Sequence, residues 1–148
     1  MVVGVVGLIG GGMVIQSLYR LSPCPLCIFQ RLLYVVIGVV ALAGVLWPRA
    51  GRVWAGGVVL IALGGVATAA YQSWMQAFPH LAPECSYTDP NLIERLVDWL
   101  GMQWPTLFLA TGFCASRDWE LFGLSIANWS VVAFVGFAAI SIWLLRRR

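Results

Sequence analysis

Four long stretches of this chain are almost free of charged residues. They cover residues 2–18, 28–47, 53–71 and 121–145. Their apolar positions are continuous and do not alternate with polar ones, which argues against β-strands. A helix of about 20 apolar residues crosses a bilayer, because the hydrocarbon core is about 30 Å thick. The pattern therefore predicts an all-α membrane protein built as a four-helix transmembrane bundle.

The polar segments between these stretches define the rest of the predicted architecture. Residues 19–27 form a short loop and residues 72–120 a long one, both on the same side of the membrane. Only 10% of the residues are charged and 61% are hydrophobic, whereas a soluble domain carries about 25% charged residues. We therefore interpret residues 1–148 as a single integral membrane domain with two outer loops.

The charged residues are divided between the two sides. Arginines occupy the turn between the second and third predicted helices (Arg49, Arg52) and the end of the chain (residues 146–148). All six acidic residues lie in the long loop. By the positive-inside tendency, both termini face the cytoplasm and both loops face outward. We expect a multi-pass protein of a bacterial inner membrane. No basic face suited to nucleic acid is present, so we expect no nucleic-acid partner.

Two alternatives concern the apolar segments. A secretory signal peptide is the alternative for residues 2–18, but no basic segment precedes them and no clear cleavage site follows. We therefore favour a first spanning helix, and expect either that Met1 lies close to the membrane or that the chain is slightly short at its N-terminus. Gly7 and Gly11, four residues apart, and the row of Gly57, Ile61 and Gly65 at the same spacing predict close helix packing.

The long outer loop contains a short amphipathic helix by its pattern. Asp89 is expected as the N-cap and Pro90 as the first helical residue. Apolar residues then recur at helical spacing, at Ile93, Leu96, Val97 and Leu100. This helix would either lie in the plane of the membrane interface or cap the mouth of the bundle, and the sequence leaves both open.

Cys24 and Cys27 form a CxxC motif at the outer start of the second predicted helix. The N-terminus of a helix favours a thiolate over a thiol, and the thiolate is the nucleophile in disulfide exchange. Arg31 lies one turn later and adds a positive charge near the motif; the alternative is that its side chain extends to the lipid headgroups. The motif therefore indicates a redox-active cysteine pair.

Cys85 and Cys114 lie in the long loop, on the same predicted side as the CxxC motif. Taken alone they suggest a structural disulfide. Beside a CxxC motif they suggest a two-step relay, in which electrons pass from one cysteine pair to the other. A zinc site is less well supported, because the two loop cysteines do not form a second close pair. A c-type haem is excluded, because Ile28 and not His follows the motif. We expect no metal.

The chain resembles the disulfide bond formation protein B (DsbB) family along nearly its whole length. The segments that carry the resemblance are residues 23–31 (PCPLCIFQR) and 107–114 (LFLATGFC), followed by Trp119, residues 122–125 (FGLS) and Trp129. The order of a CxxC motif and then two single cysteines, each in its expected loop, is specific.

The resemblance implies a protein-dithiol:quinone oxidoreductase. A DsbA-like thiol oxidase of the periplasm would attack the Cys85–Cys114 disulfide, and electrons would pass to Cys24 and Cys27. Cys27 would deliver them to ubiquinone or menaquinone, with Arg31 near the quinone. Two departures from the family pattern concern the expected quinone site. Gln30 replaces a frequent acid, and residues 71–75 lack a His that many members carry.

Three alternative functions stay open from the sequence alone. A thiol–quinone enzyme similar to vitamin K epoxide reductase shares the helix bundle, but its CxxC motif should follow the loop cysteines. A second alternative is a reductase, in which the same relay of electrons runs in reverse. A membrane scaffold stapled by static disulfides would have no catalytic activity.

Overall fold

Residues 1–81, 90–117 and 119–147 are described by the computed structural model of the chain. Its long helices are α1 (Val2–Tyr19), α2 (Pro25–Leu46), α3 (Gly51–Ala77) and α6 (Ile126–Arg147). Shorter elements are η1 (Pro48–Ala50), α4 (Leu92–Gln103), α5 (Pro105–Phe108) and the antiparallel strands β1 (Glu120–Leu121) and β2 (Leu124–Ser125). The four long helices are apolar enough to cross a membrane, so the predicted fold class is confirmed.

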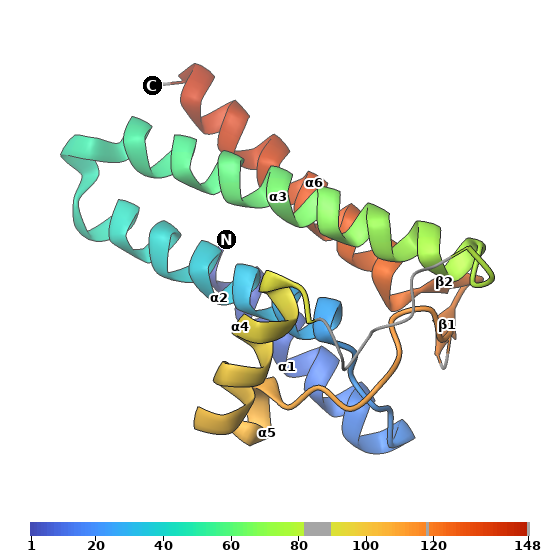
Figure 1. Cartoon of the computed structure of the whole chain (residues 1–148). Coiled ribbons are helices and arrows are strands. Elements are labelled where there is room, and N and C mark those ends of the chain that lie inside the picture. Colours follow the sequence, from blue (N-terminus) through green and yellow to red (C-terminus); the bar gives the residue numbers. More distant parts are fainter. Residues whose placement is uncertain (82–89, 118, 148) are drawn as a thin grey trace.

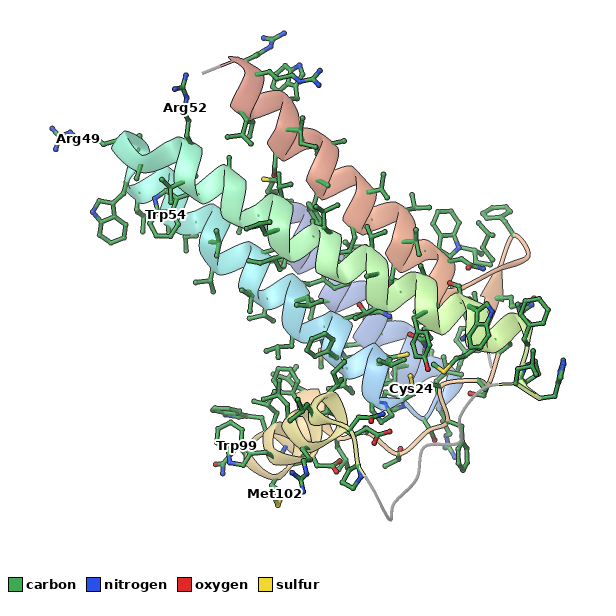
Figure 2. The ribbon with its side chains drawn as sticks, turned by 45° about the horizontal axis from the view of Figure 1, so that its top comes forward. Cys24, Arg49, Arg52, Trp54, Trp99 and Met102 are labelled. Carbon is green, nitrogen blue, oxygen red and sulfur yellow. The ribbon has the colours of Figure 1, made fainter. Side chains whose placement is uncertain are left out.

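The helices α2, α3 and α6 run alongside one another, and α1 lies behind α2 (Figure 1). Arg49 and Arg52 lie at one end of this bundle and Cys24 at the other (Figure 2). We call these the arginine end and the cysteine end. The segregation of charges and cysteines in the sequence therefore corresponds to opposite ends of the structure.

Among the long helices, two boundaries differ most from those predicted. The helix α3 extends to Ala77 instead of ending near residue 71, because the amides of Gln72 and Gln76 in its last turns find buried partners. The helix α6 begins only at Ile126, and residues 120–125 form the β1–β2 hairpin. Its turn uses positive φ angles at Phe122 (54°) and Gly123 (74°), which hydropathy does not reveal.

The main core is formed by buried residues of α2, α3 and α6, with Val5 from α1. The ring of Tyr34 from α2 stacks on that of Phe134 from α6, with centroids 4.3 Å apart. Gly65 of α3 faces the same phenylalanine so closely that a Cβ atom would overlap its ring. The predicted packing role is confirmed for Gly65.

The helix α1 is the least embedded of the long helices. Val5 is its only buried residue. A Cβ atom on Gly4 would lie 3.6 Å from the ring of Phe137, but one on Gly7 or Gly11 would meet nothing within 4 Å. The predicted packing role of Gly7 and Gly11 is therefore wrong. These glycines instead line a cavity described below.

The helix α4 packs across the first turns of α2. Val97 and Leu100 are buried with Ile28 of α2 and Phe108 of α5. The helix starts at Leu92 and not at Pro90, and the backbone N–H of Asn91 donates to Glu94 Oε2 at 2.8 Å. The predicted cap Asp89 lies outside the described residues.

The opposite face of α4 is apolar and exposed. Trp99 and Met102 project away from the bundle (Figure 2), with 52% and 75% of their surface exposed. Both expectations for this helix are compatible with this arrangement, because it covers the cysteine end of α2 and also presents an apolar surface.

Candidate redox site at the cysteine end

Cys24 and Cys27 meet at the start of α2. Cys24 is the N-cap residue, and Pro25 occupies the first turn, where a missing N–H costs nothing. The two Sγ atoms lie 3.0 Å apart, and Cys24 Sγ accepts a hydrogen bond from the Cys27 backbone N–H at 3.3 Å. The local geometry of a capped helix start therefore brings the two sulfurs of the predicted pair together.

Cys114 joins this pair from the long loop. Its side chain is in hydrogen-bonding contact with that of Cys24. Both residues are buried, with 4% and 3% of their surface exposed, and they pack on Met75. Cys24, Cys27 and the sequence-distant Cys114, all predicted as redox residues, thus form one cluster. The fourth, Cys85, lies outside the described residues, so the predicted Cys85–Cys114 pairing stays a prediction.

Backbone contacts between the two loops place Cys114. The backbone N–H groups of Thr111 and Gly112 both donate to the carbonyl oxygen of Pro23, at 2.9 and 3.0 Å. A Cβ atom at position 112 would overlap the carbonyl oxygen of Ser22, so only glycine permits this approach. The conformation of residues 111–112 therefore determines how close Cys114 comes to Cys24.

Burial and hydrogen bonding act on the acidity of Cys24. Hydrogen bonds with Cys114 and then Cys27, together with burial, hold the pKa of the Cys24 thiol well above its usual range. A buried thiol is less easily ionised, because the charged form loses its hydration. Cys24 is therefore held as a neutral thiol in the reduced cluster.

Two buried glutamines complete the polar surroundings of the sulfurs. Gln72 Nε2 lies 3.0 Å from Cys27 Sγ and 3.3 Å from Cys24 Sγ. Its Oε1 accepts a hydrogen bond from Gln30 Nε2 at 2.8 Å. The position where the sequence departs from the family pattern, Gln30, therefore contacts the redox pair through a second glutamine.

Arg31 does not extend away from the protein. Its Nη1 donates to the carbonyl oxygen of Leu107 at 2.7 Å, and its Nη2 donates to Gln16 Oε1 at 2.9 Å. The guanidinium thus connects α1 with the segment that leads to Cys114. Because these partners are internal, the headgroup alternative for Arg31 is not supported.

A cavity of about 450 Å³ opens beside the cluster, between α1, α2 and α6. Its polar lining includes Cys27, Gln30, Arg31 and Gln72, while much of the remaining wall is apolar. Small-molecule sites commonly have volumes of about 300–1,000 Å³ and mostly apolar walls with a few polar groups. The cavity is therefore large enough for an aromatic ring with oxygen substituents.

Gln16 and Gln72 were not predicted as members of the site. A usable signal existed, because a polar side chain in an otherwise apolar spanning helix is costly unless it has a partner. Gln16 lies in the uncharged residues 2–18, and Gln72 lies in residues 71–75, where the family's His is missing. Their partners became visible only in the folded chain.

Comparisons with known proteins identify the family of the chain. The family model for the disulfide bond formation protein DsbB matches residues 1–144. Disulfide bond formation protein B of Dechloromonas aromatica (strain RCB) is 59% identical over 145 residues, covering 98% of this chain and 88% of the relative. The protein of the same name from Azoarcus sp. (strain BH72) is 40% identical, with 93% and 84% covered.

A third relative, disulfide bond formation protein B 1 of Pseudomonas aeruginosa, is 37% identical over 149 residues, with 97% of this chain and 89% of the relative covered. These matches extend over the helices and both cysteine-bearing segments of the chain. Together with four helices able to span a membrane, they show that the chain is a multi-pass membrane protein of the DsbB family of disulfide bond formation proteins.

Proposed function

We propose that this chain is a protein-dithiol:quinone oxidoreductase, which reoxidises a DsbA-like thiol oxidase and passes the electrons to a membrane quinone. The observation that carries the proposal is the gathering of Cys24, Cys27 and Cys114 beside an apolar cavity that Arg31 also lines. Electron transfer from DsbA through DsbB to quinone is known to keep the bacterial periplasm oxidising.

The overall reaction balances without a further reactant. A partner dithiol loses two electrons and two protons as it becomes a disulfide. A quinone gains two electrons and two protons as it becomes a quinol. The cysteines of this chain carry the electron pair between the two, because each disulfide exchange forms one S–S bond and breaks another.

Within the chain, Cys114 and Cys24 are the sulfurs through which the two pairs would exchange. The partner thiolate attacks Cys85 and releases Cys114, which then attacks the Cys24–Cys27 disulfide at Cys24 and releases Cys27. The contact between Cys24 and Cys114 supports this order, because exchange requires the attacking sulfur to reach its target. The role of Cys85 rests on the family resemblance.

The cavity supports the assignment of ubiquinone or menaquinone as the electron acceptor. Its apolar wall suits a ring and its polyprenyl tail, and Cys27 lines it beside Arg31. A guanidinium stabilises negative charge that develops on a nearby oxygen or sulfur. Arg31 would therefore orient the quinone and stabilise the charge that develops during transfer.

The orientation in the membrane follows from the charges of the two ends. The arginine end carries Arg49, Arg52, Arg146 and Arg147 and is assigned to the cytoplasm by the positive-inside tendency. The cysteine end then faces the bacterial periplasm, where disulfides persist. A periplasmic partner would meet the long loop first.

The decisive experiment is quinone reduction by the purified chain in detergent. Reduced DsbA-like protein and ubiquinone-1 or a menaquinone analogue are supplied, and the quinone absorbance is followed. We expect turnover that Cys27→Ser and Cys85→Ser each abolish, because either change interrupts the relay. Arg31→Met should lower turnover by about 10²-fold or more, as for removal of one stabilising donor.

Two results would contradict the proposal. Folded protein that reduces neither quinone, yet keeps its cysteines oxidised in mild reductant, would indicate a scaffold with static disulfides. Oxidation of quinol coupled to reduction of the partner, with no turnover in the forward direction, would indicate a reductase.

A further inference from the structure

The amide of Gln72 is the polar group of the described chain that reaches both sulfurs of the CxxC pair. Its Nε2 lies 3.0 Å from Cys27 Sγ and 3.3 Å from Cys24 Sγ. Only 2% of the Gln72 surface is exposed. A hydrogen bond from an amide to a buried sulfur has little competition from water, so its effect on the charge of that sulfur is strong.

Gln30 fixes which way the Gln72 amide points. Gln30 Nε2 donates to Gln72 Oε1 at 2.8 Å, so the carbonyl oxygen of Gln72 faces Gln30. The NH₂ group of Gln72 is then directed to the sulfurs. Gln30 is also buried, with 3% of its surface exposed. The two amides thus form a directed chain of hydrogen bonds that ends on the cysteine pair.

We propose that Gln72 is a further catalytic residue, which stabilises the sulfur anion formed when the Cys24–Cys27 bond is broken, and that Gln30 is its positioning residue. This inference deepens the proposed function and rests on it for the biological role of that anion. It assigns a specific task to two residues that the sequence marked only as departures from the family pattern.

The step in which Gln72 acts is a disulfide exchange. The Cys114 thiolate attacks Cys24 Sγ, a bond between these two sulfurs forms, and the Cys24–Cys27 bond breaks. The electron pair of the broken bond stays on Cys27 Sγ, which leaves as a thiolate. Cys114 is oxidised and Cys27 is reduced, so charge and electrons balance. Gln72 donates an N–H to the sulfur on which the charge appears.

An amide suits this task because it cannot ionise. Gln72 remains a donor at any pH at which the protein folds, and it offers no basic nitrogen that could take the proton of a cysteine. The cationic group near the pair is Arg31, whose guanidinium donates hydrogen bonds to Leu107 and Gln16 and not to a sulfur. Gln72 therefore acts by direct contact and Arg31 at longer range.

The test is the thiol–disulfide equilibrium of the Cys24–Cys27 pair in glutathione buffers at fixed pH. The full-length chain is used in detergent, with Cys85→Ala and Cys114→Ala present throughout so that one pair is measured. Gln72→Met, which keeps the side-chain length and removes the donor, should shift the equilibrium toward the disulfide by about tenfold, which corresponds to about 30 mV. Gln30→Met should produce a smaller shift in the same direction.

Two further comparisons separate catalysis from packing. Adding Gln30→Met to Gln72→Met should cause no additional shift, because the positioning residue then has nothing to position. Gln76→Met is the matched control, since this buried glutamine lies one turn later on α3 and hydrogen-bonds Ser116 and Ser125 instead of a sulfur. It should leave the equilibrium unchanged, even if it lowers the thermal stability.

An equilibrium unchanged within twofold in Gln72→Met, or an equal shift in Gln76→Met, would overturn the proposal. If Gln72→Met does not fold, Gln30→Met carries the test, and the absence of any shift in it would overturn the positioning role. The measurement uses neither a partner protein nor quinone. Failure of the proposed oxidase activity would therefore leave this result interpretable, and the reverse also holds.

Discussion

Cys24 makes contacts that no other cysteine of the described chain combines. Cys24 caps α2, its Sγ lies 3.0 Å from Cys27 Sγ, and its side chain contacts that of Cys114 from the long loop. Its raised pKa follows from the same contacts, because a thiol that donates a hydrogen bond loses that bond when it is ionised. We therefore expect Cys24 to receive an attack in exchange reactions and to be a poor nucleophile itself.

This view predicts how Cys114→Ala changes the reactivity of Cys24. The contact with Cys114 contributes most to the raised pKa of Cys24, so the variant should lower that pKa toward its usual value. At pH 8 a larger fraction of Cys24 is then a thiolate, and alkylation of the reduced protein should become several-fold faster. The measurement is alkylation of Cys24 by iodoacetamide across a pH series, followed by fragment-ion mass spectrometry.

The shape of the pH profile is the control in this experiment. A larger opening around Cys24 would speed alkylation by the same factor at every pH. A lowered pKa instead moves the profile toward lower pH. A uniform increase without such movement would contradict the electrostatic explanation.

For individual residues, the sequence was sufficient to predict those site residues that belong to recognisable motifs. The CxxC spacing identified Cys24 and Cys27, and an isolated charge near an apolar segment identified Arg31. It was not sufficient for Gln72, because a glutamine in a helix has no motif. Its importance depends on the side-chain distance to sulfurs 45 and 48 positions away in the sequence.

Among the elements, α3 and α6 make the most extensive helix–helix contact of the described chain, and two adjacent glycines of α3 have very different surroundings. Gly65 faces Phe134, whose ring would overlap an added Cβ atom, whereas an added Cβ atom at Gly64 meets nothing within 4 Å. Phe134 is fully buried and also stacks on Tyr34. The ring therefore cannot move aside easily.

Gly65→Ala and Gly64→Ala form a matched pair that tests this packing. Both changes replace glycine by a better helix former, but only Gly65→Ala creates a steric conflict. We expect Gly65→Ala to destabilise the protein by about 1–3 kcal/mol, the usual cost of overpacking a core. Gly64→Ala should be neutral or slightly stabilising. Thermal unfolding in detergent compares the two, and equal stabilities would contradict close packing at Gly65.

The sequence predicted the existence of the elements better than their ends and contacts. Continuous apolarity located all four spanning helices, because the thickness of a bilayer imposes their length. It did not show the turn at Gly123, which interrupts an apolar run by backbone conformation alone. Nor did glycine spacing distinguish Gly65, which packs, from Gly11, which borders a cavity.

At the scale of the whole molecule, the two ends of the bundle differ in chemistry. Arg49 and Arg52 mark one end and Cys24 the other (Figure 2). This polarity was predictable from the sequence, because an even number of spans places the two termini and the turn between α2 and α3 on the same side. The meeting of the two cysteine-bearing loops was not predictable, since it depends on backbone contacts at Pro23 and Gly112.

Reporter fusions test the proposed orientation. Green fluorescent protein fused after residue 148 should fluoresce in a bacterial host, and alkaline phosphatase at the same position should be inactive, if the arginine end faces the cytoplasm as proposed. Fusion of the same reporters to chains shortened after His80 should give the opposite pattern. Active phosphatase after residue 148 would contradict the orientation.

The central place of Cys24 has a consequence that follows from valence. A sulfur atom bonded to carbon can share in only one disulfide, so Cys24 can be bonded either to Cys27 or to Cys114. The two links exclude each other, and forming one releases the other sulfur. The cluster of these three cysteines therefore holds at most one disulfide at a time, and must release each electron pair before it can accept the next.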